Sequence, residues 1–179
     1  MKPLTIDTNK DHVFGSVTAP LELIEYGDYE CPYCGTAYPI VKSIQQKLGP
    51  EMRFAFRNFP LSNIHPHEFK AAVAAEAAGL QQKFWEMHDI IFENQKALGD
   101  ENILQLAQKI GLNSERFKKD ILEKELAAKV EMDFESGIRF GVNGTPSFFA
   151  NGKKYGGELD EEELLQFLVN QITIDEIHQ

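Results

Sequence analysis

The sequence is poor in cysteine and in positive charge. Its 179 residues include only 2 Cys, too few for a small secreted scaffold held together by disulfides. The 18 Lys and Arg are outnumbered by 28 Asp and Glu, which gives a formal net charge of −10. Because nucleic acids and anionic membrane surfaces bind through basic clusters, we expect neither as a partner.

Long hydrophobic runs are also absent. No stretch approaches the roughly 18 apolar residues of a membrane span. Residues 1–12 contain no apolar core of roughly 7–15 residues, so no signal peptide is expected. We predict a cytoplasmic location, or a periplasmic or other extracytoplasmic one if a cleaved signal preceded this sequence. No internal repeat or low-complexity linker is visible, so the length favours a single domain.

The two cysteines stand together in the segment Cys31-Pro32-Tyr33-Cys34. Two intervening residues place the sulfurs across one helical turn, where they can open and close a disulfide. Cys31 falls at the N-cap of a predicted helix, and Pro32 at its first position, where the missing N–H is tolerated. The pattern predicts a redox pair, with Cys31 as the exposed nucleophile and Cys34 as the buried resolving thiol.

The surroundings of Cys31 set how acidic its thiol can be. A helix N-terminus contributes about 0.3–2 kcal/mol, which lowers a thiol pKa of about 8.5 by about one unit. The flanking Asp28 and Glu30 are negative, and no Lys or Arg lies between Lys10 and Lys42. We therefore predict a moderately lowered pKa for Cys31 and an intermediate redox potential.

A Cys-x-x-Cys pair can also be half of a zinc site. Zinc needs four ligands, usually supplied by a second pair of Cys or His at short spacing. The chain has five histidines, and His65 and His67 at a predicted helix start are not a typical ligand pair. We expect no metal and no bound cofactor.

The hydrophobic pattern predicts an α/β fold in the order β-α-β, a helical block, then β-β-α. A parallel pair with a right-handed crossover follows from the first three elements. The single domain would span residues 1–179, with its α/β parts at about 13–62 and 141–173 and a helical insertion at about 63–140. The predicted strands are 21–26, 52–59, 147–150 and 153–155; the predicted helices run from the cysteine pair to 48, then 68–78, 84–92, 101–110, 114–140 with a break around 123–127, and 160–172.

Four segments together resemble the DsbA-like branch of the thioredoxin superfamily. They are APLELIEYGDYECPYC, FRNFPL with HPHEFKAAVAAEAA, KFWEMHDIIFENQ, and GVNGTPSFFANGKKYGG. The resemblance covers nearly everything from residue 15 to residue 168. It implies a thioredoxin fold with an inserted all-helical subdomain between the second and third core strands. It also implies a thiol–disulfide oxidoreductase with protein or peptide substrates, a redox-recycling partner and no cofactor.

The resemblance assigns roles to three further residues. Glu25 lies six residues before Cys31, where the superfamily often has a buried acid that moves the proton of the resolving thiol; the alternative is a solvated strand-end carboxylate. Thr145-Pro146 is similar to the family's cis-proline dipeptide, whose backbone pairs with the substrate. The sequence alone predicts a trans bond and an ordinary proline before an edge strand.

Two other functions stay open from the sequence. Pro-Tyr between two cysteines also occurs in glutaredoxins, so a glutathione-linked reductase is one alternative. A non-catalytic binding domain switched by its disulfide is the other. The sequence does not distinguish an oxidant from a reductase or an isomerase.

Overall fold

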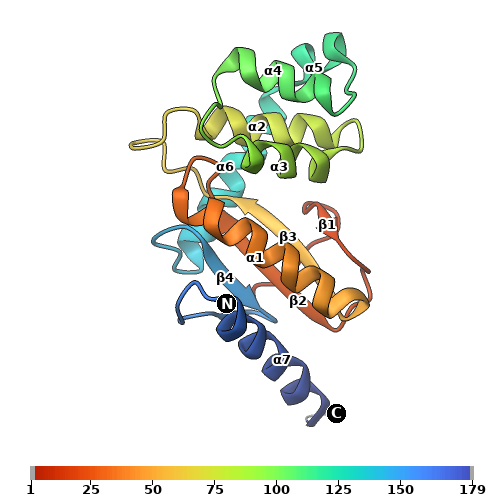
Figure 1. The fold of residues 1–179 in the computed structure, drawn as a ribbon, viewed down its shortest axis with the longest axis vertical. Coiled ribbons are helices and arrows are strands. Elements are labelled where there is room, and N and C mark those ends of the chain that lie inside the picture. The colour runs from red at the N-terminus through yellow and green to blue at the C-terminus, as the bar shows by residue number, and fades with distance from the viewer. Residues whose placement is uncertain (1–2, 178–179) are drawn as a thin grey trace. The chain divides into compact units, whose positions relative to one another are not determined.

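The computed structural model describes residues 3–177, with side chains for residues 3–172 (Figure 1). The chain divides into two compact units, which we call the sheet unit and the helical unit. The sheet unit comprises residues up to Tyr26, Thr36–Arg57 and the chain from Pro146 on, and the helical unit comprises Gly27–Gly35 and Asn58–Thr145. The elements are β1 Val13–Phe14, β2 Leu21–Gly27, α1 Pro32–Leu48, η1 Gly49–Glu51, β3 Met52–Asn58, α2 Glu68–Gly79, α3 Phe84–Glu93, α4 Asp100–Lys109, α5 Ser114–Asp120, α6 Lys124–Arg139, β4 Ser147–Ala150, β5 Lys153–Lys154 and α7 Glu161–Ile177.

The sheet unit is built on five strands in the order β1-β3-β2-β4-β5. The Phe59 N–H donates to the Gly27 carbonyl just beyond β3 and at the end of β2, so these two strands run parallel, as the β-α-β order predicts. The outer pairs β1–β3, β2–β4 and β4–β5 are antiparallel. The sequence did not predict β1, because two residues are too few to show an alternating pattern.

A turn at Asn151-Gly152 connects β4 to β5. Both residues have positive φ, 45° and 78°, which Asn and Gly tolerate better than other residues. The Asn151 side chain also accepts a hydrogen bond from the Glu22 N–H at 2.8 Å. The strand β5 ends at Lys154, one residue before its predicted end.

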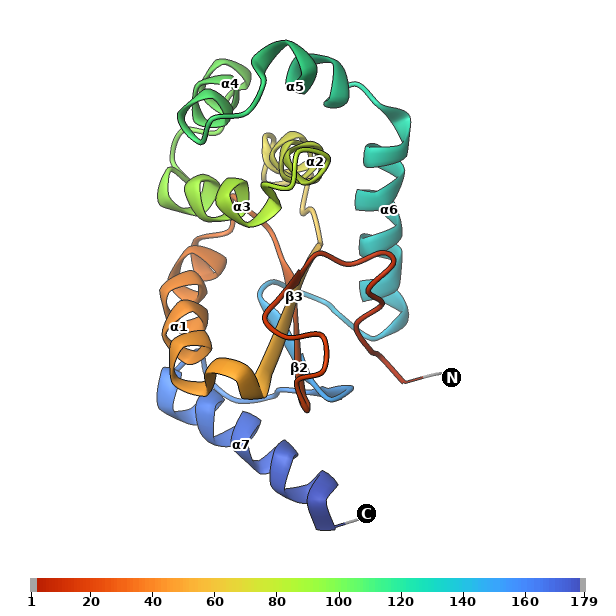
Figure 2. The same cartoon turned by 90° about the vertical axis from the view of Figure 1, so that its right-hand side faces the viewer.

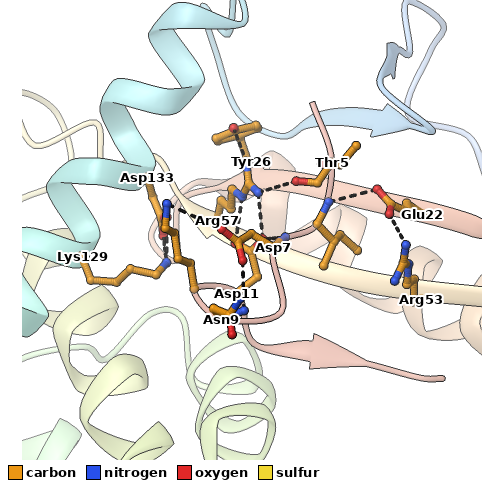
Figure 3. Close-up of polar contacts among 12 residues, drawn as sticks. Thr5, Asp7, Asn9, Asp11, Glu22, Tyr26, Arg53, Arg57, Lys129 and Asp133 are labelled. Carbon is orange, nitrogen blue, oxygen red and sulfur yellow. Dashed lines mark hydrogen bonds and ion pairs between the residues drawn. The ribbon is translucent and has the colours of Figure 1, made fainter. Parts of the chain in front are cut away.

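A buried arginine ties the N-terminal segment to the sheet. Arg57 of β3 donates to both carboxylate oxygens of Asp11, to the Thr5 carbonyl and to the Tyr26 hydroxyl (Figure 3). Arg57 is only 8% exposed, and its buried positive charge is paired with the carboxylate of Asp11. Bidentate pairing of this kind suits the planar guanidinium group.

The helices α1 and α7 meet in the sheet unit (Figure 2). The Glu161 carboxylate accepts hydrogen bonds from the Ser43 hydroxyl and the Lys47 ammonium, both at 2.6 Å. Asp160 caps α7, since its side chain accepts the Glu163 N–H at 3.0 Å. The helix continues past its predicted end at Ile172.

The helical unit is organised around α2, which contacts α3, α4, α5 and α6. Its six alanines are buried, and small side chains let neighbouring helices approach closely. The predicted break in 114–140 is present, but it lies at residues 121–123 rather than around 123–127. Within the part of the chain that the structure describes, no helix combines the length and apolar character needed to cross a membrane.

Candidate active site

The cysteine pair lies at the start of α1. Cys31 directly precedes the helix, as predicted, and Cys34 completes its first turn. Both residues are free thiols, with Cys34 fully buried and Cys31 4% exposed. The prediction that Cys31 is exposed is therefore wrong for the free dithiol. Its sulfur lies 3.4 Å from the Thr145 carbonyl, which accepts a hydrogen bond from the thiol and covers it.

The pKa of Cys31 is lowered to about 5, chiefly by a hydrogen bond from the Cys34 thiol. Burial opposes this change, while the backbone N–H groups of Cys34 and Tyr33 add to it. The decrease is larger than the single unit expected from the helix N-terminus, because that expectation left out the second thiol as a donor. Cys31 therefore has a substantial thiolate fraction at neutral pH.

Asp28 holds the cysteine-bearing loop in shape. Its N–H donates to the Cys34 sulfur at 3.5 Å, and its carboxylate accepts the N–H groups of Glu30 and Cys31 at 2.8 and 3.0 Å. The other carboxylate oxygen accepts the Leu61 N–H at 2.9 Å and contacts the His65 ring nitrogen at 2.8 Å. From the sequence, Asp28 was considered only as a negative charge close to Cys31. An Asp directly after Gly and before the motif is a typical signal for a side chain that binds backbone N–H groups two and three residues on.

Gln95 is a second residue that the sequence reading missed. It follows α3, and its amide donates to the Cys31 carbonyl at 2.7 Å. The contact requires glycine at position 35, because a Cβ there would overlap the Gln95 amide. No local motif announces a contact between residues 64 positions apart.

The tyrosines beside the cysteines differ in exposure. Tyr33, between the two cysteines, is 70% exposed. Tyr29 is fully buried, its hydroxyl lies 3.1 Å from a ring nitrogen of His88, and its ring packs on Phe92. Tyr33 is therefore the aromatic side chain that the loop presents to solvent.

Other expected site residues divide between the two units. Thr145 belongs with both cysteines to the helical unit, whereas Glu25 and Pro146 belong to the sheet unit. Glu25 is 3% exposed within β2, opposite Phe148 of β4, so the solvated alternative is wrong. Its role in proton transfer, and that of Thr145-Pro146 in substrate binding, stay predictions.

Metal ligands do not cluster anywhere in the described chain. Among residues 3–172, whose side chains are described, no group of three or more Cys, His, Asp or Glu could hold a metal ion.

Known proteins resemble this chain over most of its length. A family model described as Thioredoxin matches residues 7–170. A thioredoxin-like oxidoreductase from Silicibacter pomeroyi DSS-3 is 27% identical, with a TM-score of 0.79 and 92% of each chain covered. Oxidised BdbD from Bacillus subtilis has a TM-score of 0.81 at 23% identity, covering 93% of this chain and 95% of its own, and this likeness concerns the fold alone.

Curated relatives of this sequence are longer proteins. A protein named Na(+)/H(+) antiporter NhaA 1 from Salinispora arenicola is 38% identical over 159 residues. The match covers 89% of this chain but 24% of the antiporter. The chain thus spans about a quarter of the length of the curated relatives that it matches.

Proposed function

We propose that this chain, which belongs to the thioredoxin family as a DsbA-like member, exchanges disulfides with protein substrates through Cys31 and Cys34. The fold is that of the DsbA-like thiol–disulfide oxidoreductases. The observation that carries the proposal is the Cys31 thiol at the start of α1, with its pKa lowered to about 5 chiefly by a hydrogen bond from Cys34. A thiolate is the attacking species in disulfide exchange, and a neighbouring thiol can resolve the mixed disulfide.

In the reducing direction, the Cys31 thiolate attacks one sulfur of a substrate disulfide. The S–S bond of the substrate breaks, and its other sulfur leaves as a thiolate that takes up a proton. Cys34 then loses its proton and attacks Cys31, releasing the first substrate sulfur and leaving an intramolecular disulfide. Two electrons pass to the substrate, and a redox partner must return two electrons before the next cycle. The oxidising direction is the reverse sequence.

Buried Glu25 is the residue we propose to handle the proton of Cys34. A carboxyl group can accept a proton and give it back, which is the role that the resemblance implies for Glu25. Substrate binding is proposed for the backbone of Thr145 beside Pro146, by addition of an extended peptide. The exposed Tyr33 ring offers an apolar contact for an unfolded chain.

Replacement of each cysteine tests the proposal. We expect Cys31→Ser to reduce insulin reduction and the refolding of a reduced substrate to the uncatalysed rate. Cys34→Ser keeps the nucleophile but not the resolving thiol, so it should accumulate mixed disulfides detectable by mass spectrometry. Unchanged turnover in Cys31→Ser would show that the proposed catalytic role of Cys31 is wrong.

The direction of electron flow follows from the reduction potential. A value near about −120 mV indicates an oxidant, and one near about −270 mV a reductase. In a cytoplasmic location, where thiols are kept reduced, we propose the reducing direction. Turnover with glutathione as the sole reductant would favour the glutaredoxin-like alternative.

A further inference from the structure

A buried acid at the start of α2 touches the cysteine loop. Glu68 is 0% exposed, and one of its carboxylate oxygens, Oε2, accepts a hydrogen bond from the Tyr29 N–H. The other oxygen, Oε1, is also buried and has no hydrogen-bond partner among the described residues. An ionised Glu68 would therefore leave one negatively charged oxygen without a donor in the protein interior, which is unfavourable.

Asp28, a second buried acid in this loop, lies close enough for its charge to act on Glu68. Asp28 is 0% exposed, and its two oxygens accept hydrogen bonds from backbone N–H groups and contact His65. Burial first, and then the negative charge of Asp28, raise the pKa of Glu68 well above its usual value. Among the described residues, neither acid forms an ion pair with Lys or Arg. Two buried carboxylates with no such cation favour sharing one proton.

We propose that Asp28 and Glu68 share one proton at neutral pH, and that Glu68 is a positioning residue that couples this proton to the Cys31–Cys34 redox pair. The inference rests on the proposed function. With the proton on Glu68, Oε1 becomes a donor toward Asp28, and Oε2 still accepts the Tyr29 N–H. Asp28 then keeps its charge for the N–H of Cys31. The Asp28–Glu68 pair then carries one negative charge in place of two.

When the Asp28–Glu68 pair loses its shared proton, the added negative charge changes the stability of the Cys31 thiolate. A second negative charge beside the loop disfavours the Cys31 thiolate, which exists only in the reduced protein. Alkaline pH should therefore shift the equilibrium toward the disulfide by more than the thiols alone require. Reciprocally, reduction of the disulfide should strengthen proton binding by the Asp28–Glu68 pair.

Other charged groups around Glu68 have partners of their own. Glu30 accepts the His67 N–H, and His88 of α3 contacts the Tyr29 hydroxyl. Lys70, on the exposed side of α2, pairs with Asp100 of α4. About two turns further along α2, Glu76 faces Lys129 and Asp133 of α6. His65 contacts Asp28 directly, and comparing a Glu68 variant with the unsubstituted protein leaves this contact in both proteins.

Glu68→Gln is the variant that isolates the proton. Its carbonyl can accept the Tyr29 N–H and its NH₂ group can donate to Asp28, so it imitates the protonated acid but cannot lose the proton. Glu115→Gln is a matched control with the same change of charge in the same unit. Glu115 is exposed on α5 and pairs with Lys118.

Infrared difference spectra between the reduced and oxidised protein at pH 7 provide the first test. We expect a protonated-carboxyl band that changes with the redox state in the unsubstituted protein and in Glu115→Gln, and that is absent in Glu68→Gln. This measurement needs no substrate, and absence of the band from the unsubstituted protein overturns the proposal even if Glu68→Gln does not fold.

The equilibrium with glutathione provides the second test. The equilibrium constant for reduction of the disulfide by glutathione is measured for Glu68→Gln and for the unsubstituted protein. The ratio of the first constant to the second should be near one at pH 6. It should rise to about tenfold in favour of the reduced variant at pH 10, which corresponds to roughly one pKa unit of charge interaction. A ratio that stays at one across this range contradicts the proposal. Because substrate turnover is not measured, failure here differs from failure of the proposed function.

Discussion

The helix α2 buries two glutamates in opposite electrostatic surroundings. Glu76 is 4% exposed, accepts a hydrogen bond from the Asn58 amide at 3.0 Å and lies 3.8 Å from the Lys129 ammonium. Lys129 also contacts both carboxylate oxygens of Asp133 at 2.7 Å (Figure 3). Glu68, two turns earlier, faces Asp28 and backbone N–H groups, with no Lys or Arg paired to it among the described residues.

The two clusters show two ways of burying a pair of carboxyl groups. A lysine beside Glu76 and Asp133 supplies a positive charge to the first cluster. The pair beside the cysteines is balanced by a proton, which leaves as the pH rises. A fixed cation suits a structural contact between helices, and a titratable proton suits a site whose sulfur atoms change charge.

Removal of the fixed cation should have the largest effect on stability. We expect Lys129→Met to lower the free energy of unfolding by about 3–5 kcal/mol, because Glu76 and Asp133 would stay buried without a positive charge. Urea unfolding at pH 7, followed by circular dichroism, measures the change. A loss below about 1 kcal/mol would mean that the two acids take up a proton as easily as Asp28 and Glu68, and the contrast would disappear.

Asp133 should give the next largest effect, which depends on pH. Burial raises its pKa to about 6 despite Lys129, so between about pH 4 and pH 6 the folded protein binds more protons there than the unfolded chain. The contribution of Asp133 is therefore greatest below pH 4 and is lost as the pH rises through 6. Asp133→Asn should remove this loss. The difference in the free energy of unfolding between the variant and the unsubstituted protein should therefore change by about 2–3 kcal/mol between pH 4 and pH 7. A difference that does not vary with pH would contradict the raised pKa.

Exposed charge on the same helix should matter least. Lys70 and Asp100 pair at 2.8 Å, but their side chains are 65% and 73% exposed. We expect Lys70→Met to change the free energy of unfolding by less than about 1 kcal/mol, since solvent weakens exposed ion pairs. The same urea titration checks this value. An effect as large as that of Lys129→Met would show that burial does not explain the difference between the pairs.

The sequence predicted the long elements and the position of the cysteine pair well. The alternating pattern of 52–59 and the turn at Asn151-Gly152 depend on neighbouring residues, so they are visible in a short window. The cysteine spacing and Pro32 likewise define the start of α1 locally. By contrast, β1 is too short to carry a pattern, and its place in the sheet depends on pairing with β3.

The rest of the site depends on contacts between distant residues. Glu68 looks like an ordinary acid at a helix start, which is normally solvated, and only the fold brings it to Tyr29. Gln95 reaches Cys31 from beyond α3 for the same reason. The exposure of Cys31 was overestimated because the sequence does not reveal that the Thr145 carbonyl covers its sulfur. Tertiary contacts, not local preferences, set these features.

The carbonyl of Cys31 already has two donors. The Gly35 N–H donates to it at 3.0 Å, as in any helix, and the Gln95 amide donates at 2.7 Å. A carbonyl oxygen has two lone pairs, so the main chain of the nucleophile has no acceptor left for a docking peptide. Under the proposed function, a substrate strand must find its backbone partners on the Thr145 side alone. The N-to-C direction in which a bound peptide passes the Cys31 sulfur would then be set by the segment around Thr145 alone.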